Sequence, residues 1–243
     1  MASHHHRQQS PVLGIPIALR ILWCMRCFRE AVTAFNPNFQ KPLVINCCMD
    51  ATGANRCRDC FRAGAHCHQA ATGMLGDAED LMKTIDQVKM MIEHPSIDKS
   101  GWKIQVRTAC WRALQHLSSA FSSAELAHRQ FHGLDLPKKD HEKPYSTYLF
   151  ERRQFLGALP ILPPNATRAD RFENAAARLL RLLPGDEGYL ILATAKMRFI
   201  GSLKNAIRDQ HEVAEQGSIK DDEAAARLID ALDVDFSWLY CIL

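Results

Sequence analysis

Apolar side chains recur every three or four positions over residues 77–93, as one buried face of an α-helix requires. Pro95 then ends the pattern, because its ring nitrogen has no hydrogen to donate to the helical ladder. A second stretch, over residues 100–132, has the same spacing and is followed by Gly133, which suits the end of a helix. We therefore predict two amphipathic helices. Their apolar stripes are Leu81, Ile85, Val88 and Ile92 in the first, and Val106, Cys110, Ala113, Leu117, Phe121 and Ala124 in the second.

Between residues 134 and 164 this periodicity fails, and five of the eleven prolines fall there, so we predict a long loop or linker. Helical spacing returns after Thr167, which has the spacing of a capping box with Asp170. We predict three helices in this last part, the first ending at Pro184 and the final one capped by Ser218. Their apolar positions are Phe172, Ala176, Leu179 and Leu183, then Tyr189, Ala193, Met197, Ile200, Leu203 and Ile207, and last Ala225, Leu228, Ile229 and Leu232.

The pattern contains no internal repeat and no series of strands, so the predicted fold is mainly α. A small N-terminal cysteine-rich zinc module is followed by an all-α helical body. The expected divisions are a flexible N-terminus over 1–19, the zinc-binding module over 20–73, a helical segment over 74–132, a proline-rich loop or linker over 133–166 and a helical C-terminal segment over 167–243.

Composition adds one unusual feature to this picture. Of the 243 residues 47% are hydrophobic and 23% charged, which is typical of globular proteins. No apolar run approaches the roughly 18 residues of a membrane helix, and residues 11–25 lack the cleavage site of a secretory signal. We therefore expect an intracellular protein, nuclear or cytoplasmic, that has no membrane partner. Seven of the nine cysteines, however, lie between Cys24 and Cys67, and cysteines used only as small core side chains would be scattered.

The cysteine spacing predicts a Zn²⁺ site. A Cys-x2-Cys pair brings two thiolates to one ion and leaves two tetrahedral positions for a second, distant pair. Gly64 supplies the positive φ that the chain needs before it returns to Cys67. Disulfides would require export, a redox pair would need a thioredoxin-like pattern, and inert cysteines do not explain two such pairs. The candidate ligands are Cys24, Cys27, Cys47, Cys48, Cys57, Cys60 and Cys67.

The sequence leaves two ligand assignments open. One ion could be held by the two Cys-x2-Cys pairs alone. Alternatively, Cys67 and either Cys47 or Cys48 could join them, so that six thiolates hold two ions through bridging sulfurs. His66 and His68 are alternative ligands, although each by itself is typical of a solvated loop.

Charge divides where the cysteines end. Residues 1–73 carry eight basic and three acidic side chains, whereas the rest of the chain carries 22 basic and 24 acidic ones. The excess of basic residues in 1–73, beside a slightly acidic remainder, favours an anionic partner for this part of the chain, such as DNA or another nucleic acid. The candidate phosphate contacts are Arg26, Arg29, Arg56, Arg58 and Arg62.

The segment from Cys57 to Cys67, Cys-Arg-Asp-Cys-Phe-Arg-Ala-Gly-Ala-His-Cys, resembles the second half of the fungal Zn2Cys6 binuclear cluster. The first half departs from that family, since nineteen residues separate Cys27 from Cys47 where the family has about six, and a dense basic run is missing. The whole arrangement is similar to uncharacterised fungal proteins that carry a cysteine-rich domain of unknown function. The Zn2Cys6 resemblance implies a transcription regulator whose cluster docks a helix in the DNA major groove.

We therefore expect a zinc-binding regulatory protein that contacts nucleic acid. The alternative is a zinc-stapled module for protein–protein interaction, for which the C-terminal residues 236–243 would offer a surface, although such a tail is more typical of one docked in the core. We expect no enzymatic activity, because the metalloprotease, zinc-deaminase, phosphate-loop and serine-hydrolase motifs are all missing. The oligomeric state stays open.

Overall fold

The computed structural model describes residues 16–18, 23–50, 56–93, 104–154, 156, 165, 167, 174 and 176–212. It divides into two compact units. We call residues 1–33 and 44–69 the cysteine module, and residues 34–43 and 70–243 the helical body. The predicted module range of 20–73 therefore differs from the observed unit, because residues 34–43 and 70–73 belong to the helical body.

Within its described residues, the cysteine module contains two short helices and a two-stranded sheet. Helix α1 spans Met25–Ala34 and helix α2 spans Arg58–Arg62. Strand β1 (Pro16–Ala18) pairs antiparallel with strand β2 (Cys48–Asp50), and Ile17 lies opposite Met49. The sequence predicted no strand, because three-residue strands are too short to show an alternating pattern. The fold class is nevertheless mainly α, as predicted. The predicted flexible N-terminus lies outside the described residues, except for β1.

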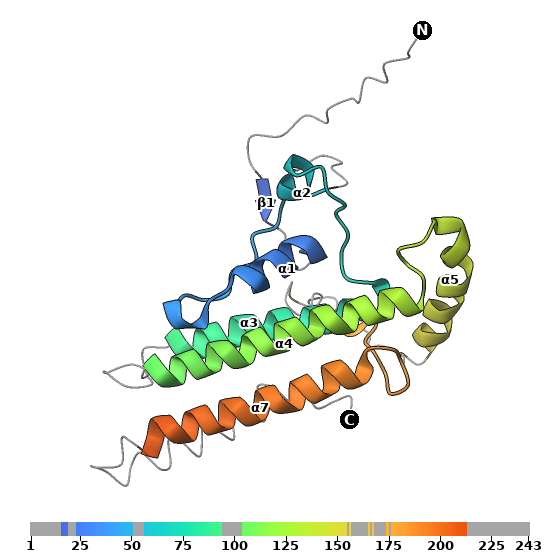
Figure 1. Ribbon diagram of the computed structural model, residues 1–243. Coiled ribbons are helices and arrows are strands. Elements are labelled where there is room, and N and C mark those ends of the chain that lie inside the picture. Colours follow the sequence, from blue (N-terminus) through green and yellow to red (C-terminus); the bar gives the residue numbers. More distant parts are fainter. Residues whose placement is uncertain are drawn as a thin grey trace. The chain divides into compact units, whose positions relative to one another are not determined.

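Three long helices form the centre of the helical body. Helix α3 spans Leu75–Glu93, α4 spans Ile104–Phe131 and α7 spans Tyr189–Glu212. Figure 1 shows α4 between the other two, with successive helices running in opposite directions. The predicted stripes of α3 and α4 are confirmed, since every one of their ten apolar positions is buried. The helical body also contains two short 3-10 helices, which span Pro37–Phe39 and Thr72–Met74.

The predicted stripe of α7 is only partly right. Met197 is 49% exposed, whereas Lys196 beside it is 7% exposed. Lys196 is buried because its Nζ lies 3.1 Å from Oδ1 of Asp77 on α3. An apolar pattern could not find this position, since a lysine enters a core only when a buried carboxylate neutralises it.

The helix predicted to end at Pro184 also ends earlier than expected. The chain leaves helical conformation at Arg178 and passes the N-terminal end of α3 without regular secondary structure, where the backbone N–H of Gly76 donates to the carbonyl of Leu180 at 2.8 Å. There Asp80 forms two hydrogen bonds with the Arg181 guanidinium, at 2.7 and 2.8 Å, and Asp77 accepts one from the backbone N–H of Leu182 at 2.8 Å. These side-chain bonds replace the helical ladder over residues 180–183. The predicted final helix beginning at Ser218 lies outside the described residues.

The proline-rich stretch predicted to be a loop contains a helix. Helix α5 spans Lys138–Gln154, directly after Pro137, and carries Pro144 in its interior. The prediction was wrong because α5 buries only one side chain, Tyr145, and so has no apolar stripe to reveal it. Within the part of the chain that the structure describes, no helix has the length and apolar content needed to cross a membrane.

Candidate metal centre

Each Cys-x2-Cys pair lies at the beginning of a helix in the cysteine module. Cys24 directly precedes α1, and Cys57 is the N-cap residue of α2. The Sγ of Cys24 accepts a hydrogen bond from the backbone N–H of Cys27, and the Sγ of Cys57 accepts one from that of Cys60, each at 3.4 Å. The N-terminal end of a helix favours negative charge, so both pairs are placed where thiolates are stabilised.

A third cysteine joins each Cys-x2-Cys pair, because its sulfur accepts a hydrogen bond from the backbone of the pair's first cysteine. The backbone N–H of Cys24 donates to the Sγ of Cys47 at 3.3 Å, and the backbone N–H of Cys57 donates to the Sγ of Cys67 at 3.2 Å. Gly64, with φ of +60°, turns the chain after α2 and lets it return to Cys67, as predicted. The module therefore contains two matching half-sites: Cys24, Cys27 and Cys47 in the first, and Cys57, Cys60 and Cys67 in the second.

The two half-sites meet through their sulfur atoms. The Sγ of Cys24 lies 3.7 Å from that of Cys57 and 3.5 Å from that of Cys60. The Sγ of Cys27 lies 3.5 Å from that of Cys57. These distances are close to the roughly 3.8 Å that separates two thiolates placed 2.3 Å from one tetrahedral ion. They are far from the roughly 2.05 Å of a disulfide bond, and the cysteines of the described residues are all free.

The six sulfurs fall into two groups of four. One group is formed by Cys24, Cys27, Cys47 and Cys57, and the other by Cys24, Cys57, Cys60 and Cys67, and within each group all sulfurs lie within 4.8 Å of one another. Cys24 and Cys57 belong to both. This geometry is compatible with metal binding, and each group has the four ligands of a tetrahedral site.

The surroundings of these thiols shift their pKa values in different directions. All are buried except Cys67, which is half-buried. Burial raises the pKa of Cys27 and Cys60, and it raises the pKa of Cys67 to about 11. The pKa of Cys24, in contrast, is lowered to about 4, chiefly because the Cys47 thiol donates a hydrogen bond to its thiolate. Protein groups alone therefore stabilise one thiolate beside several neutral thiols, and a metal cation would stabilise all of them as thiolates.

Apolar and backbone contacts hold the first half-site from outside. The rings of Trp23 and Phe28 are stacked, with centroids 4.7 Å apart, and both are buried. The backbone N–H of Met25 donates to the carbonyl of His68 at 2.8 Å, which ties the start of α1 to the chain just after Cys67. Such surrounding contacts fix ligand positions and keep water away from them.

Three of the predicted or alternative ligands lie outside both groups. Cys48, which the sequence did not distinguish from Cys47, lies in β2 opposite Ala18. Cys47, which directly precedes the strand, is the one of the two whose sulfur belongs to a group. His66 is exposed, and neither it nor His68 belongs to a group. The structure thus brings together six of the seven predicted cysteines and leaves Cys48 outside both groups.

The predicted arginines lie on and beside the two short helices. The guanidinium of Arg26 pairs with Glu30 one turn later on α1, at 2.8 Å, and this pair raises the pKa of Arg26. Arg29, Arg56 and Arg58 are half-buried, and Arg62 at the end of α2 is exposed. Arg26 is therefore partly neutralised within its own helix, which the sequence analysis did not foresee although the i, i+4 spacing from Glu30 was visible.

Comparison of this chain with protein-family models, with curated proteins and with solved structures gives no match.

Proposed function

We propose that the cysteine module holds two Zn²⁺ ions in a binuclear cluster, with Cys24 and Cys57 as bridging ligands. The two overlapping groups of four sulfurs carry this proposal, because six thiolates can give each of two ions four ligands only if two sulfurs are shared. An all-sulfur donor set of buried thiols is typical of zinc and excludes the hard cations, which prefer oxygen.

The role of these ions would be structural. Every ligand position of both groups would be filled by protein, and a zinc ion that catalyses hydrolysis needs an open position. The cluster would have a formal charge of −2, from two divalent ions and six thiolates. This leaves most of the basic excess of residues 1–73, which is five charges, for contact with an anion.

We further propose that the module contacts nucleic acid as part of a regulatory protein. Arg62 is exposed, Arg58 lies one turn earlier on the same short helix, and Arg56 immediately precedes Cys57. Three arginines within seven residues, on backbone that a metal cluster would hold rigid, form a compact group of candidate phosphate contacts. The Zn2Cys6 resemblance of this same segment supports the proposal.

A fluorescence-anisotropy titration with labelled duplex DNA, carried out over a series of salt concentrations, tests the proposal. We expect binding that weakens as salt rises, and each of Arg56→Gln, Arg58→Gln and Arg62→Gln should lower the slope of log K against log salt by about 0.9 for each phosphate that the arginine neutralises. Arg153→Gln is the matched control, because Arg153 is an exposed arginine at the end of α5 in the helical body. Equal weakening by all four variants, or no binding at about 50 mM salt, would contradict a nucleic-acid role.

The alternative, a zinc-stapled protein-interaction module, is favoured by one observation. Phe61 on α2 is 47% exposed and Val44 is 56% exposed, so the cysteine module presents apolar as well as basic side chains to solvent. Two zinc ions per chain together with no affinity for DNA or RNA would favour this alternative. The residues 236–243 that first suggested it lie outside the described residues.

A further inference from the structure

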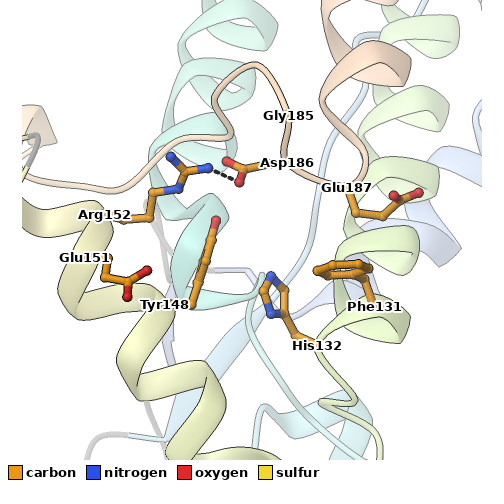
Figure 2. A pocket seen from close by; sticks show the side chains of 8 residues that line it. All are labelled: Phe131, His132, Tyr148, Glu151, Arg152, Gly185, Asp186 and Glu187. Carbon is orange, nitrogen blue, oxygen red and sulfur yellow. Dashed lines mark hydrogen bonds and ion pairs between the residues drawn. The ribbon is translucent and has the colours of Figure 1, made fainter.

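A pocket of about 290 Å³ opens in the helical body, near the size at which small-molecule sites begin. Its walls come from three places: the end of α4, the second half of α5 and the turn before α7 (Figure 2). The sequence analysis missed it, because α5 had been predicted as part of a loop. The pocket belongs entirely to the helical body, so the inference does not depend on the metal centre.

Aromatic rings line one side of this pocket. The centroids of His132 and Tyr148 are 4.4 Å apart, and the ring of Phe131 lies edge-on to His132 with centroids 5.0 Å apart. Figure 2 shows the three rings side by side, with Glu151 at one end of the row and Glu187 at the other. Phe131 is 70% exposed, so a large apolar ring remains in contact with water at the mouth of the pocket.

The positive charge of the pocket is already neutralised. The guanidinium of Arg152 pairs with Asp186, whose other carboxylate oxygen accepts a hydrogen bond from the backbone N–H of Leu183 at 2.7 Å. The same guanidinium lies 5.4 Å from the centroid of the Tyr148 ring. Arg152 is thus held by two neighbours at the edge of the pocket and is poorly placed to recognise an anionic ligand.

The negative charge of the pocket is not neutralised. Glu151 and Glu187 are both exposed, and neither has an ion-pair partner among the described residues. The remaining titratable ring, His132, adds no positive charge at neutral pH, because burial lowers its pKa. Two carboxylates therefore border the row of aromatic rings, and the one arginine of the pocket lining, Arg152, pairs with Asp186 rather than with either of them.

We propose that this pocket binds an organic cation, an alkylammonium or guanidinium group, which would lie over the aromatic rings and between Glu151 and Glu187. Aromatic faces attract such cations through their quadrupoles, and the flanking carboxylates add direct charge attraction. A metal ion fits less well, because among the described residues the only groups of three or more close ligand atoms are the cysteines. The pocket is also larger than a bare ion requires.

Isothermal titration calorimetry on the full chain tests this proposal, with cadaverine as a free diamine and N-acetyl-lysine amide as a substitute for a peptide side chain. We expect saturable binding of at least one of them, with a Kd in the millimolar range. Tighter binding of cadaverine would identify a free amine as the source of the cation, and tighter binding of the lysine amide would identify a basic peptide. Glutarate and pentane-1,5-diol, which match cadaverine in length, are the anionic and neutral controls.

Single substitutions assign the binding to this pocket. Glu151→Gln, Glu187→Gln and Tyr148→Leu should each weaken binding about threefold to tenfold. Glu142→Gln is the matched control, because Glu142 is an exposed glutamate on the same helix that pairs with Lys138 instead of lining the pocket. The two glutamine variants change only exposed side chains, so their folding is not in question.

Three results would overturn the proposal. One is the lack of saturable heat from both cations at about 10 mM. Another is binding of glutarate as tight as that of cadaverine, which would assign the pocket to Arg152 and an anion. The third is equal weakening by Glu142→Gln and by the two pocket variants, which would show only a general attraction of cations to acidic surface.

Discussion

The cysteine module and the helical body have buried centres of opposite chemistry. In the module, six cysteines form two overlapping groups of four sulfurs, and the buried rings of Trp23 and Phe28 lie beside them. In the body, α4 packs against α3 and α7 through largely apolar faces, which also enclose the ion pair of Asp77 with Lys196. Small units bury too little apolar surface to be stable alone and rely on metals or disulfides, whereas longer helices are stabilised by packing. If the module holds zinc as proposed, the two units are stabilised by different means, metal binding in one and packing in the other.

The largest effect should follow from substituting a shared cysteine. Cys57 belongs to both groups of sulfurs, so Cys57→Ser should remove both zinc ions and the order of the module. Cys27 belongs to one group only, and Cys27→Ser should leave about one ion per chain. Elemental analysis of protein purified under reducing conditions measures the zinc. Circular dichroism should show that the helices of the body persist.

Cys48→Ser is the control for these variants, since Cys48 lies outside both groups and should leave the zinc content unchanged. Equal zinc loss from Cys48→Ser and Cys57→Ser would contradict the assignment of the bridging ligands. Unfolding of the whole chain on zinc removal would show that the two units are not independently stabilised.

The next largest effect concerns the buried ion pair of the body. Lys196→Met leaves the Asp77 carboxylate buried without its cation, and we expect a loss of about 3–5 kcal/mol in the free energy of unfolding. The double variant Asp77→Asn with Lys196→Met should recover much of this loss, because the uncompensated charge is gone and the asparagine oxygen can still accept from Leu182. Urea denaturation measures both. A double variant less stable than Lys196→Met alone would contradict this account.

A pH-dependent effect of about 3 kcal/mol is expected from His128. Burial lowers its pKa to about 4 from an ordinary value of 6.5, and the neighbouring His132 adds to this effect. Between these pH values the unfolded chain binds a proton that the folded chain does not. Protonation of His128 therefore does not change the free energy of unfolding above pH 6.5. Below that pH it lowers the free energy of unfolding progressively, as the pH falls toward 4.

Thermal or urea unfolding over this pH range, compared between the natural chain and His128→Gln, measures the contribution. The variant should show a flatter pH dependence whatever its absolute stability. His116→Gln is the matched control, because His116 is an exposed histidine on the same helix. If His128→Gln and His116→Gln flattened the pH dependence of stability equally, the effect could not come from the burial of His128. The comparison between variants also cancels any acid-dependent change in the cysteine module.

The smallest expected effect comes from a packing substitution in the helical body, which should lower the free energy of unfolding without changing the zinc content of the cysteine module. Ile207→Val removes one buried methyl group from α7 and should cost about 1 kcal/mol, without any change in zinc content. Ile191→Val on the same helix, at a position 42% exposed, should cost much less. A change in zinc content in either variant would show that the two units are coupled.

Patterns visible along the chain predicted much of this architecture. The stripes of α3 and α4 were found because a helix that packs on one side must repeat its apolar residues with the helical period. The clustering of cysteines predicted a metal site, because the Cys-x2-Cys spacing brings two thiolates together within one turn of chain. Gly64 was identified because few other residues adopt a positive φ.

Other features depended on partners distant in the sequence. Helix α5 was missed because it buries little, and the segment without regular secondary structure near Arg181 was missed because Asp77 and Asp80 lie about a hundred residues earlier. Local patterns carry no information about such partners. The pocket beside Tyr148 was missed for the same reason, since its lining comes from three separate segments.

The sequence by itself determined that the chain is mainly helical, that its cysteines are concentrated near one end and that they have metal-ligand spacing. Those properties follow from local periodicity and from the short reach of a Cys-x2-Cys turn. Only the tertiary structure decided between Cys47 and Cys48, brought Cys24 and Cys57 into both groups of sulfurs, and placed Lys196 against Asp77. These are contacts between side chains that are far apart along the chain, and their distances are set by how the whole chain folds.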